Sequence, residues 1–186
     1  MKFAGYLRAI EKLYAKADRT LKLQKPASAR SLRDLEAELE APLPAELRVA
    51  WELGDGSADY ANLFARPGYL TGYELLSVAG ARKERESMRK RAPGYAAAKY
   101  EERKPRDPRI QPGWFAPGWL PFGGFGGGSL LLLVDLSPAP KGKVGQVIAF
   151  THDPDQMSYV ETSFEKFLTA SSKAFAKYAS ELIDEA

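Results

Sequence analysis

An uninterrupted apolar run, "LLLLV" at residues 130–134, constrains the fold of this 186-residue chain more than any other segment. It has the length of a strand, and apolar residues at every position are typical of a strand buried on both faces. Only residues 123–128 separate "SLLLLVDL" from "WLPF", and only residues 137–145 separate it from "QVIAF". A parallel crossover needs about a dozen residues or more. We therefore expect these neighbouring strands to pair antiparallel, with the run in the centre, covered by helices.

The region before the strands reads as helical. Apolar residues recur at steps of three and four from Phe3 to Leu21, which indicates one buried helix face. Ser31, three residues before Asp34, is predicted to cap a second helix. A third is predicted to begin near Pro44 and to end at "GDG", residues 54–56.

The remaining elements follow from shorter signals. "GYELLS" at 72–77 is a short strand candidate, a basic helix is predicted over about 77–91, and residues 92–118, with five prolines, are expected to be irregular but ordered. Thr162 and Glu165 form a T-x-x-E capping box that predicts the final helix. Its apolar face consists of Phe164, Phe167, Leu168, Phe175, Tyr178 and Leu182. Together the elements predict an α+β fold: a single domain, residues 1–186, with an antiparallel β-meander, N-terminal helices and a C-terminal helix.

The glycine-rich stretch "GGFGGGS", residues 123–129, invites comparison with phosphate-binding loops. Gly123 and Gly128 have the P-loop glycine spacing, but the lysine that would reach the phosphates is missing. The dinucleotide fingerprint is also unmatched, since a glycine would be needed at 129. A strand rather than a helix follows, so no helix N-terminus is available to an anion. We therefore interpret the glycines as a link between two strands and expect no nucleotide and no other cofactor.

The single histidine, His152 in "THDPDQ", is the one candidate for acid–base chemistry or for a metal site with Asp153 and Asp155. No G-x-S-x-G supports a serine triad, and the EF-hand glycine and glutamate are missing. We favour a turn in which Asp153 bonds its own backbone ahead of Pro154. Without cysteines there is no thiolate zinc site and no cysteine nucleophile. We therefore expect that the chain is not an enzyme and that it has neither catalytic residues nor a metal site.

Charge is unevenly distributed. Residues 82–109 carry eleven Lys and Arg against five acids, whereas residues 151–186 carry three lysines against seven acids. A basic segment can bind nucleic acid or an acidic protein, but the mixed signs of "RKERE" favour a solvated helix face. We therefore expect that the chain does not bind nucleic acid. The N-terminus does not resemble a signal peptide and no run approaches a membrane span, so we expect a cytoplasmic protein without membrane contact, and favour a monomer.

Two loops are the candidate recognition surfaces, because loops held on a rigid scaffold commonly carry binding residues. Trp51 is expected in the core, and Trp114 is the tryptophan expected to be most exposed. The first loop, residues 57–70, offers Asp59, Tyr60 and Phe64. The second loop, residues 94–118, offers Tyr95, Arg103, Arg106, Arg109, Trp114 and Phe115. Because interface hot spots favour Trp, Tyr and Arg, we rank the second loop first.

Several segments, taken in order, resemble the SUKH superfamily, in the branch of fungal cell-wall-assembly regulators (Smi/Knr type) and bacterial toxin-immunity proteins. They are "LPAELRVAWELGDG" (43–56), "GYELLS" (72–77), "WLPFGGFGGGSLLLLVDLSPAPKGKVGQVIAFTHD" (119–153) and "SFEKFL" (163–168). The resemblance implies a core over 31–168, an N-terminal helical extension over 1–27 similar to those of bacterial members, and a C-terminal helix that continues over 169–186.

The resemblance also implies an α+β fold and a non-enzymatic role. The first function that the resemblance implies for this chain is that of an immunity protein, which neutralises a cognate protein toxin by stoichiometric binding. The alternative is a regulatory or scaffold protein in cell-wall or envelope synthesis. Because inhibitors of nuclease toxins tend to be acidic, the basic balance of this chain argues against a nuclease target unless residues 151–186 make the contact.

Overall fold

The computed structural model describes the backbone of residues 1–184 and the side chains of residues 1–183. The helices are α1 (Phe3–Lys16), α2 (Ala29–Leu39), α3 (Ala45–Leu53), α4 (Val78–Ala97), α5 (Phe164–Lys177) and α6 (Ala179–Asp184). The strands are β1 (Phe64–Ala65), β2 (Gly72–Leu75), β3 (Trp119–Phe125), β4 (Leu130–Asp135), β5 (Gln146–Thr151) and β6 (Gln156–Glu161). Of the predicted C-terminal helix, residues 185 and 186 lie outside the described part.

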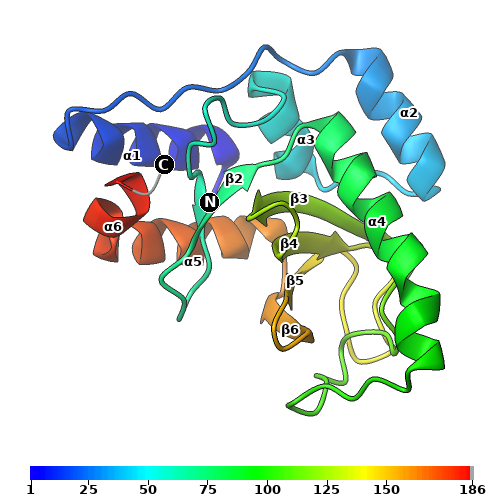
Figure 1. Cartoon of the computed structure of the whole chain (residues 1–186). Coiled ribbons are helices and arrows are strands. Elements are labelled where there is room, and N and C mark those ends of the chain that lie inside the picture. Colours follow the sequence, from blue (N-terminus) through cyan, green and yellow to red (C-terminus); the bar gives the residue numbers. More distant parts are fainter. Residues whose placement is uncertain (185–186) are drawn as a thin grey trace.

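The six strands form one sheet in sequence order, β1-β2-β3-β4-β5-β6, and every neighbouring pair is antiparallel (Figure 1). This confirms the α+β meander with helices before and after it. The reasoning from connector length holds because the turns before and after β4 are too short for a crossover.

Strand β4 is central and is buried on both faces, as the leucine run predicts. Leu132 and Val134 belong to a core that includes Leu120, Phe122, Val147 and Ala149 from the neighbouring strands. Leu131 and Leu133 point to the opposite face and pack with Trp119, Ile148 and Phe150. Alternate residues of one strand therefore serve two separate cores, which the two-residue period of a strand requires.

The first core lies beneath α1, α3 and α5. Figure 1 shows α1 and α5 side by side on one side of the sheet, and they are in contact. Phe64, Phe122, Phe164 and Phe167 form a ring cluster there, with centroid separations of 5.1–6.4 Å. Trp51 lies in this core and is fully buried, as expected.

Helix α1 is tied into this core rather than lying on its surface. Its Tyr6 hydroxyl donates to the Leu63 carbonyl at 2.7 Å, and its Tyr14 hydroxyl donates to the Asn62 carbonyl at 2.8 Å. Burial raises the pKa of Tyr14 to about 12. The Phe3 backbone N–H donates to Glu46 Oε2 at 2.7 Å, and Lys2 pairs with the same carboxylate. The predicted extension, residues 1–27, therefore supplies part of the first core.

Two helix caps differ from the prediction. Ser28, not Ser31, caps α2, and the Ser31 N–H is the group that donates to it. Ser163, not Thr162, caps α5 by accepting from the Lys166 N–H. In each case a second hydroxyl residue within three positions fits the N-cap geometry better, which a sequence pattern alone does not resolve.

Helix α4 is longer than predicted. It continues past residue 91 to Ala97, with Pro93 and Gly94 inside it. These residues oppose helix formation, but tertiary packing outweighs them because Tyr95 stacks on Trp114 with ring centroids 4.4 Å apart.

The glycine-rich stretch is a hairpin, but Gly123 and Gly124 belong to β3 itself rather than to the link. A Cβ on Gly124 would lie 2.9 Å from Leu76 Cδ2, so a larger residue at this strand position would have to displace the end of the Leu76 side chain. Gly126, Gly127 and Gly128 form the turn, with φ angles of 60°, 63° and 91°, a left-handed conformation that favours glycine.

No helix within residues 1–184 is both long enough and apolar enough to cross a membrane.

Replacing Leu132 with aspartate should unfold the chain. The side chain is fully buried between β3 and β5, and an unpaired carboxylate there costs several kcal/mol against a total stability of about 5–15 kcal/mol. Circular dichroism should show no cooperative melting transition. The matched control is Val144→Asp at a side chain that is 72% exposed, and it should melt like the wild type. A native melting curve for Leu132→Asp would contradict the central position of β4.

Candidate protein-binding surface

Residues 98–118, which we call the basic loop, cover the second face of the sheet together with α4. Its Ile110, Trp114 and Ala116 are buried against Leu131, Leu133 and Phe150. The segment has no helix or strand of its own, as expected from its prolines. It is therefore held in place by side-chain contacts rather than by a backbone ladder.

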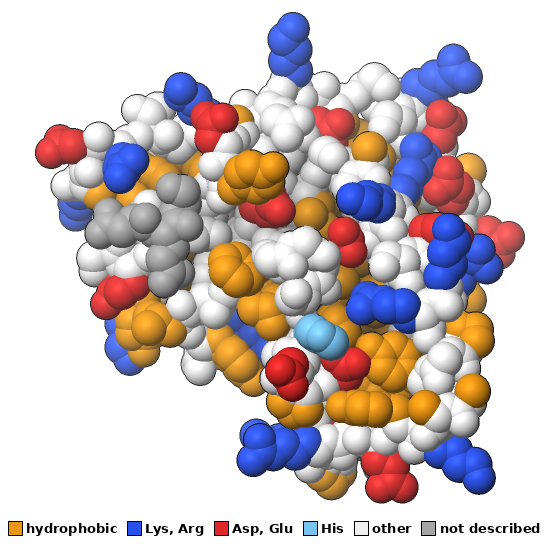
Figure 2. Space-filling model, in the orientation of Figure 1, with side chains coloured by type: hydrophobic (Ala, Val, Ile, Leu, Met, Phe, Trp, Pro, Cys, Tyr) orange, Lys and Arg blue, Asp and Glu red, His pale blue; other side chains and the backbone are white. Residues whose placement is uncertain are grey.

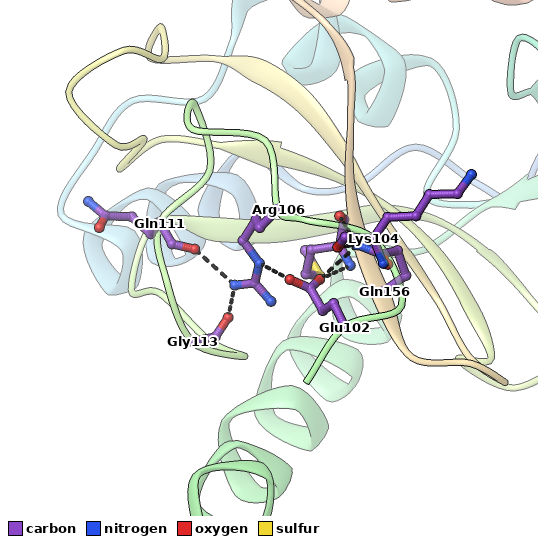
Figure 3. A network of polar contacts seen from close by, with 7 residues as sticks. Glu102, Lys104, Arg106, Gln111, Gly113 and Gln156 are labelled. Atoms are coloured by element: carbon purple, nitrogen blue, oxygen red, sulfur yellow. Dashed lines mark hydrogen bonds and ion pairs between the residues drawn. The ribbon is translucent and has the colours of Figure 1, made fainter. Parts of the chain in front are cut away.

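One polar network fixes this loop (Figure 3). Arg106 donates from Nε to Glu102 Oε2 at 2.7 Å and from Nη1 to the carbonyls of Gln111 and Gly113. Glu102 Oε1 accepts from the Met157 N–H at 2.6 Å, which joins the loop to β6. The side chains of Arg106 and Glu102 are only 13% and 10% exposed, so this ion pair is committed to holding the loop.

Trp114 belongs to the same anchorage. It stacks on Tyr95, meets Tyr100 edge-on at 5.4 Å, and has the Arg106 guanidinium 5.0 Å from its ring centroid. It is the most accessible of the three tryptophans, as expected, but at 8% exposure it is buried. Its ring therefore fastens the loop to the body and presents little surface to a partner.

His152 lies in the turn between β5 and β6, consistent with the turn interpretation. Its Nδ1 contacts Asp155 Oδ1, and the other carboxylate oxygen of Asp155 accepts from the Tyr95 hydroxyl. Burial, and then the Asp155 charge, raise the pKa of Tyr95 to about 12. The Asp155 N–H donates to the Tyr100 hydroxyl at 3.1 Å. Asp155 thus links the turn to α4 and the basic loop.

The remaining predicted residues of the loop differ in availability. Arg109 pairs with Asp107 at 2.6 Å and lies 3.3 Å above the Tyr159 ring centroid. Phe115 is half-buried under Arg85. Arg103 is exposed, and no carboxylate in the described part of the chain lies within ion-pair distance of it. Of the four loop residues with guanidinium or indole groups, Arg103 is therefore the one free to meet a partner.

The first candidate loop divides in the same way. Phe64 is fully buried in β1, whereas Asp59 and Tyr60 are exposed, with Tyr60 at 81%. Tyr60 borders a hollow with Asn62, Glu74 and Phe125. Asp59 borders a different one beside Arg19 and Lys22. Asp59 and Tyr60 therefore do not share a hollow with the basic loop.

The two loops do meet elsewhere, at a hollow of about 340 Å³ that we call the basic hollow. Tyr69 lines it from the β1–β2 connection, Arg103 and Lys104 from the basic loop, and Thr151, Gln156 and Ser158 from β5 and β6. Arg66 is not itself among the lining residues but contacts two of them. It is 4% exposed, donates from Nη1 to Thr151 Oγ1 at 3.2 Å, and lies 3.8 Å from the Tyr69 ring centroid.

Sequence reasoning missed Arg66, Tyr69 and Lys104. The available signal was "LFARPGY", where one arginine interrupts a buried apolar stretch.

Figure 2 shows one face of the molecule, with His152 as its pale-blue side chain, hydrophobic side chains around it, and Lys and Arg side chains at its lower edges. Fold and surface together describe a scaffold with two packed cores and loops that present charged and aromatic groups.

Comparison with known proteins agrees with this description. The SMI1 / KNR4 family (SUKH-1) model matches residues 26–170. A "Cell wall biosynthesis/cell cycle regulator smi1" of Schizosaccharomyces pombe is 32% identical over 154 residues, which is 76% of this chain and 29% of the relative. A "KNR4/SMI1 homolog" of Yarrowia lipolytica is 27% identical over 189 residues, which is 77% of this chain and 26% of the relative.

The chain belongs to the SMI1/KNR4 (SUKH-1) family. This confirms the superfamily and branch expected from the sequence. The chain spans less than a third of the length of these two fungal relatives. Helix α1 lies before the matched residues, although it is packed into the same core.

Replacing Trp114 with alanine should lower stability by about 3 kcal/mol, because it removes a buried ring on which the basic loop depends. Thermal unfolding measures this loss. The matched control is Tyr60→Ala, which removes an exposed ring and should leave the melting temperature unchanged. Unchanged melting of Trp114→Ala would show that the ring does not fasten the loop.

Replacing Glu74 with glutamine should stabilise the protein at pH 7. Burial, and then the charge of Glu84, raise the pKa of this carboxyl above its ordinary 4.5. Between the unfolded and the folded pKa, the folded state therefore holds a proton that the unfolded state has lost, and stability falls as pH rises from about 4.5 through the folded pKa. The variant should melt above the wild type at pH 7, and the difference should disappear below about pH 4.5. A difference independent of pH would contradict this cause.

Proposed function

We propose that this chain is a non-enzymatic, cytoplasmic protein-binding domain that regulates cell-wall or envelope synthesis through a partner. The main support is the family match over residues 26–170, together with a wall-synthesis regulator among the relatives. This favours the alternative of the sequence analysis over toxin neutralisation. We propose that Arg103, Asp59 and Tyr60 are exposed contact residues, and that Arg106, Arg109, Trp114 and Phe115 contribute by shaping the loop.

Toxin neutralisation is the second candidate. The observation in its favour is α1, which lies outside the matched residues but packs into the core, like the extensions expected in bacterial members. In that case the partner would be a cognate protein toxin bound stoichiometrically. The net charge of +3 argues against a basic nuclease as the target.

Gene deletion in the organism that carries the chain separates the two candidates. Under the first proposal, the deletion strain should become at least several-fold more sensitive to an inhibitor of wall-polymer synthesis. A plasmid copy of the full chain should restore resistance, whereas Leu132→Asp should not. Under the second, the strain should grow normally with the inhibitor and be killed in co-culture with its parent. A strain unaffected in both assays would overturn both proposals.

A further inference from the structure

We propose that the basic hollow binds a phosphorylated serine or threonine of a partner protein. This rests on the proposed function, since it names the chemistry by which the domain recognises its partner. The phosphate would lie against Arg66, Arg103 and Lys104, with the Tyr69 ring beside the partner backbone.

The first observation is the buried cation. Arg66 is 4% exposed, and buried arginines are ordinarily paired with a carboxylate. No carboxylate among residues 1–183 lies within ion-pair distance of it. A guanidinium has five N–H groups. Arg66 donates to Thr151 Oγ1 and also interacts with the Tyr73 hydroxyl, so both of its polar side-chain partners are neutral groups. Burial raises the pKa of the neighbouring Tyr73 and Arg66 opposes that rise, so the phenol does not balance the charge.

The second observation is that the loop backbone at Lys104, next to Arg103, is held in place before a ligand binds. The Lys104 N–H donates to Gln156 Oε1 at 3.0 Å, and Gln156 Nε2 donates back to the Lys104 carbonyl at 3.2 Å. Glu102 then joins the same loop to β6. Figure 3 shows the Lys104 side chain extending away from the Glu102–Arg106 pair. Fixing the backbone before binding reduces the entropy lost when a ligand is held.

Of the carboxylates nearest in sequence, Glu101 is exposed and therefore screened by water, whereas Glu102 and Asp155 are already engaged. Glu102 accepts from Arg106, Gln156 and Met157, and Asp155 is shared by His152 and Tyr95. Asp153, beside Pro154 at the edge of the hollow, is exposed, so water screens its charge. Arg103 and Lys104 therefore line the hollow, and Arg66 bonds to its lining residue Thr151. None of the three is within ion-pair distance of a carboxylate in the described part of the chain.

Phosphate fits this arrangement better than other anions. A phosphorylated side chain carries close to two negative charges and three strong acceptor oxygens, and arginine clusters are the usual means of recognising it in peptides. One carboxylate would leave more of the positive charge unbalanced. Nucleic-acid binding draws on cations spread along a backbone, whereas Arg103 and Lys104 line one hollow of about 340 Å³ and Arg66 contacts two of its other lining residues.

Fluorescence polarisation with the full chain tests the proposal. The probes are a labelled peptide library with random flanks around a central phosphoserine or phosphothreonine, and the same library without phosphate. We expect saturable binding of the phosphorylated library, at least tenfold tighter than of the other. Arg103→Ala with Lys104→Ala should weaken it at least tenfold without changing the melting temperature, and Arg66→Gln should do the same if it folds.

The matched control removes two positive charges elsewhere, at the exposed Lys141 and Lys143. Lys141→Ala with Lys143→Ala should bind like the wild type. Equal weakening by both double variants would reduce the effect to net charge and overturn the proposal, as would equal binding of the two libraries. Vesicles containing phosphatidylinositol 4-phosphate form a further arm. The proposal would also be overturned if the chain bound these vesicles but not the phosphorylated peptides, and if Arg103→Ala with Lys104→Ala abolished the vesicle binding.

The deletion strain distinguishes this proposal from the function on which it rests. If the Arg103→Ala, Lys104→Ala chain restores resistance to the wall inhibitor as well as the wild type does, the proposed function stands and phosphate recognition fails. If the wild-type chain itself has no effect on the phenotype, the proposed function fails, whatever the peptides show.

Discussion

The fold depends on the burial of β4 on both of its faces. Leu132 and Val134 face one core, and Leu131 and Leu133 face the other. A strand with apolar residues at every position cannot leave either face to water, because each exposed leucine would forgo about 1.5–3 kcal/mol of burial. Helices α1, α3 and α5 satisfy this requirement on one side. On the other, α4 covers only part of the sheet, and the basic loop supplies the rest.

An irregular segment can serve as a cover only if its backbone polar groups find partners. The basic loop meets this condition through side chains: Arg106 donates to the carbonyls of Gln111 and Gly113, and Gln156 bonds both the N–H and the carbonyl of Lys104. An ion pair as buried as Glu102–Arg106 contributes little net stability in itself, since desolvation offsets the attraction. Its effect is to select one loop conformation, and with it the positions of Arg103 and Lys104.

The sequence predicted what local pattern and chain length determine. The leucine run indicated the central strand, and the connectors indicated antiparallel pairing. The prediction was wrong where tertiary contacts decide. Gly124 is a strand residue because it pairs with Glu74 of β2 and Leu131 of β4, and α4 continues through Pro93 because Tyr95 stacks on Trp114. The burial of Trp114 and the position of Arg66 were likewise beyond reach, because both depend on partners about 30 to 85 residues away in the chain.

The basic hollow is a consequence of the curvature of the sheet. Arg66 follows β1 at one edge, yet it bonds to Thr151 at the end of β5, three strands farther on than its neighbour β2. A flat sheet with strands about 4.8 Å apart would separate these residues by nearly 20 Å, so the sheet must curl to bring them together. The same curl brings Tyr69 to the β5–β6 turn, and the Arg66 guanidinium is buried with no carboxylate of residues 1–183 within ion-pair distance. Burial of an unpaired cation is unfavourable in the isolated domain. An anion bound in the hollow would offset that desolvation cost. The exposed charges elsewhere on the surface do not carry this cost.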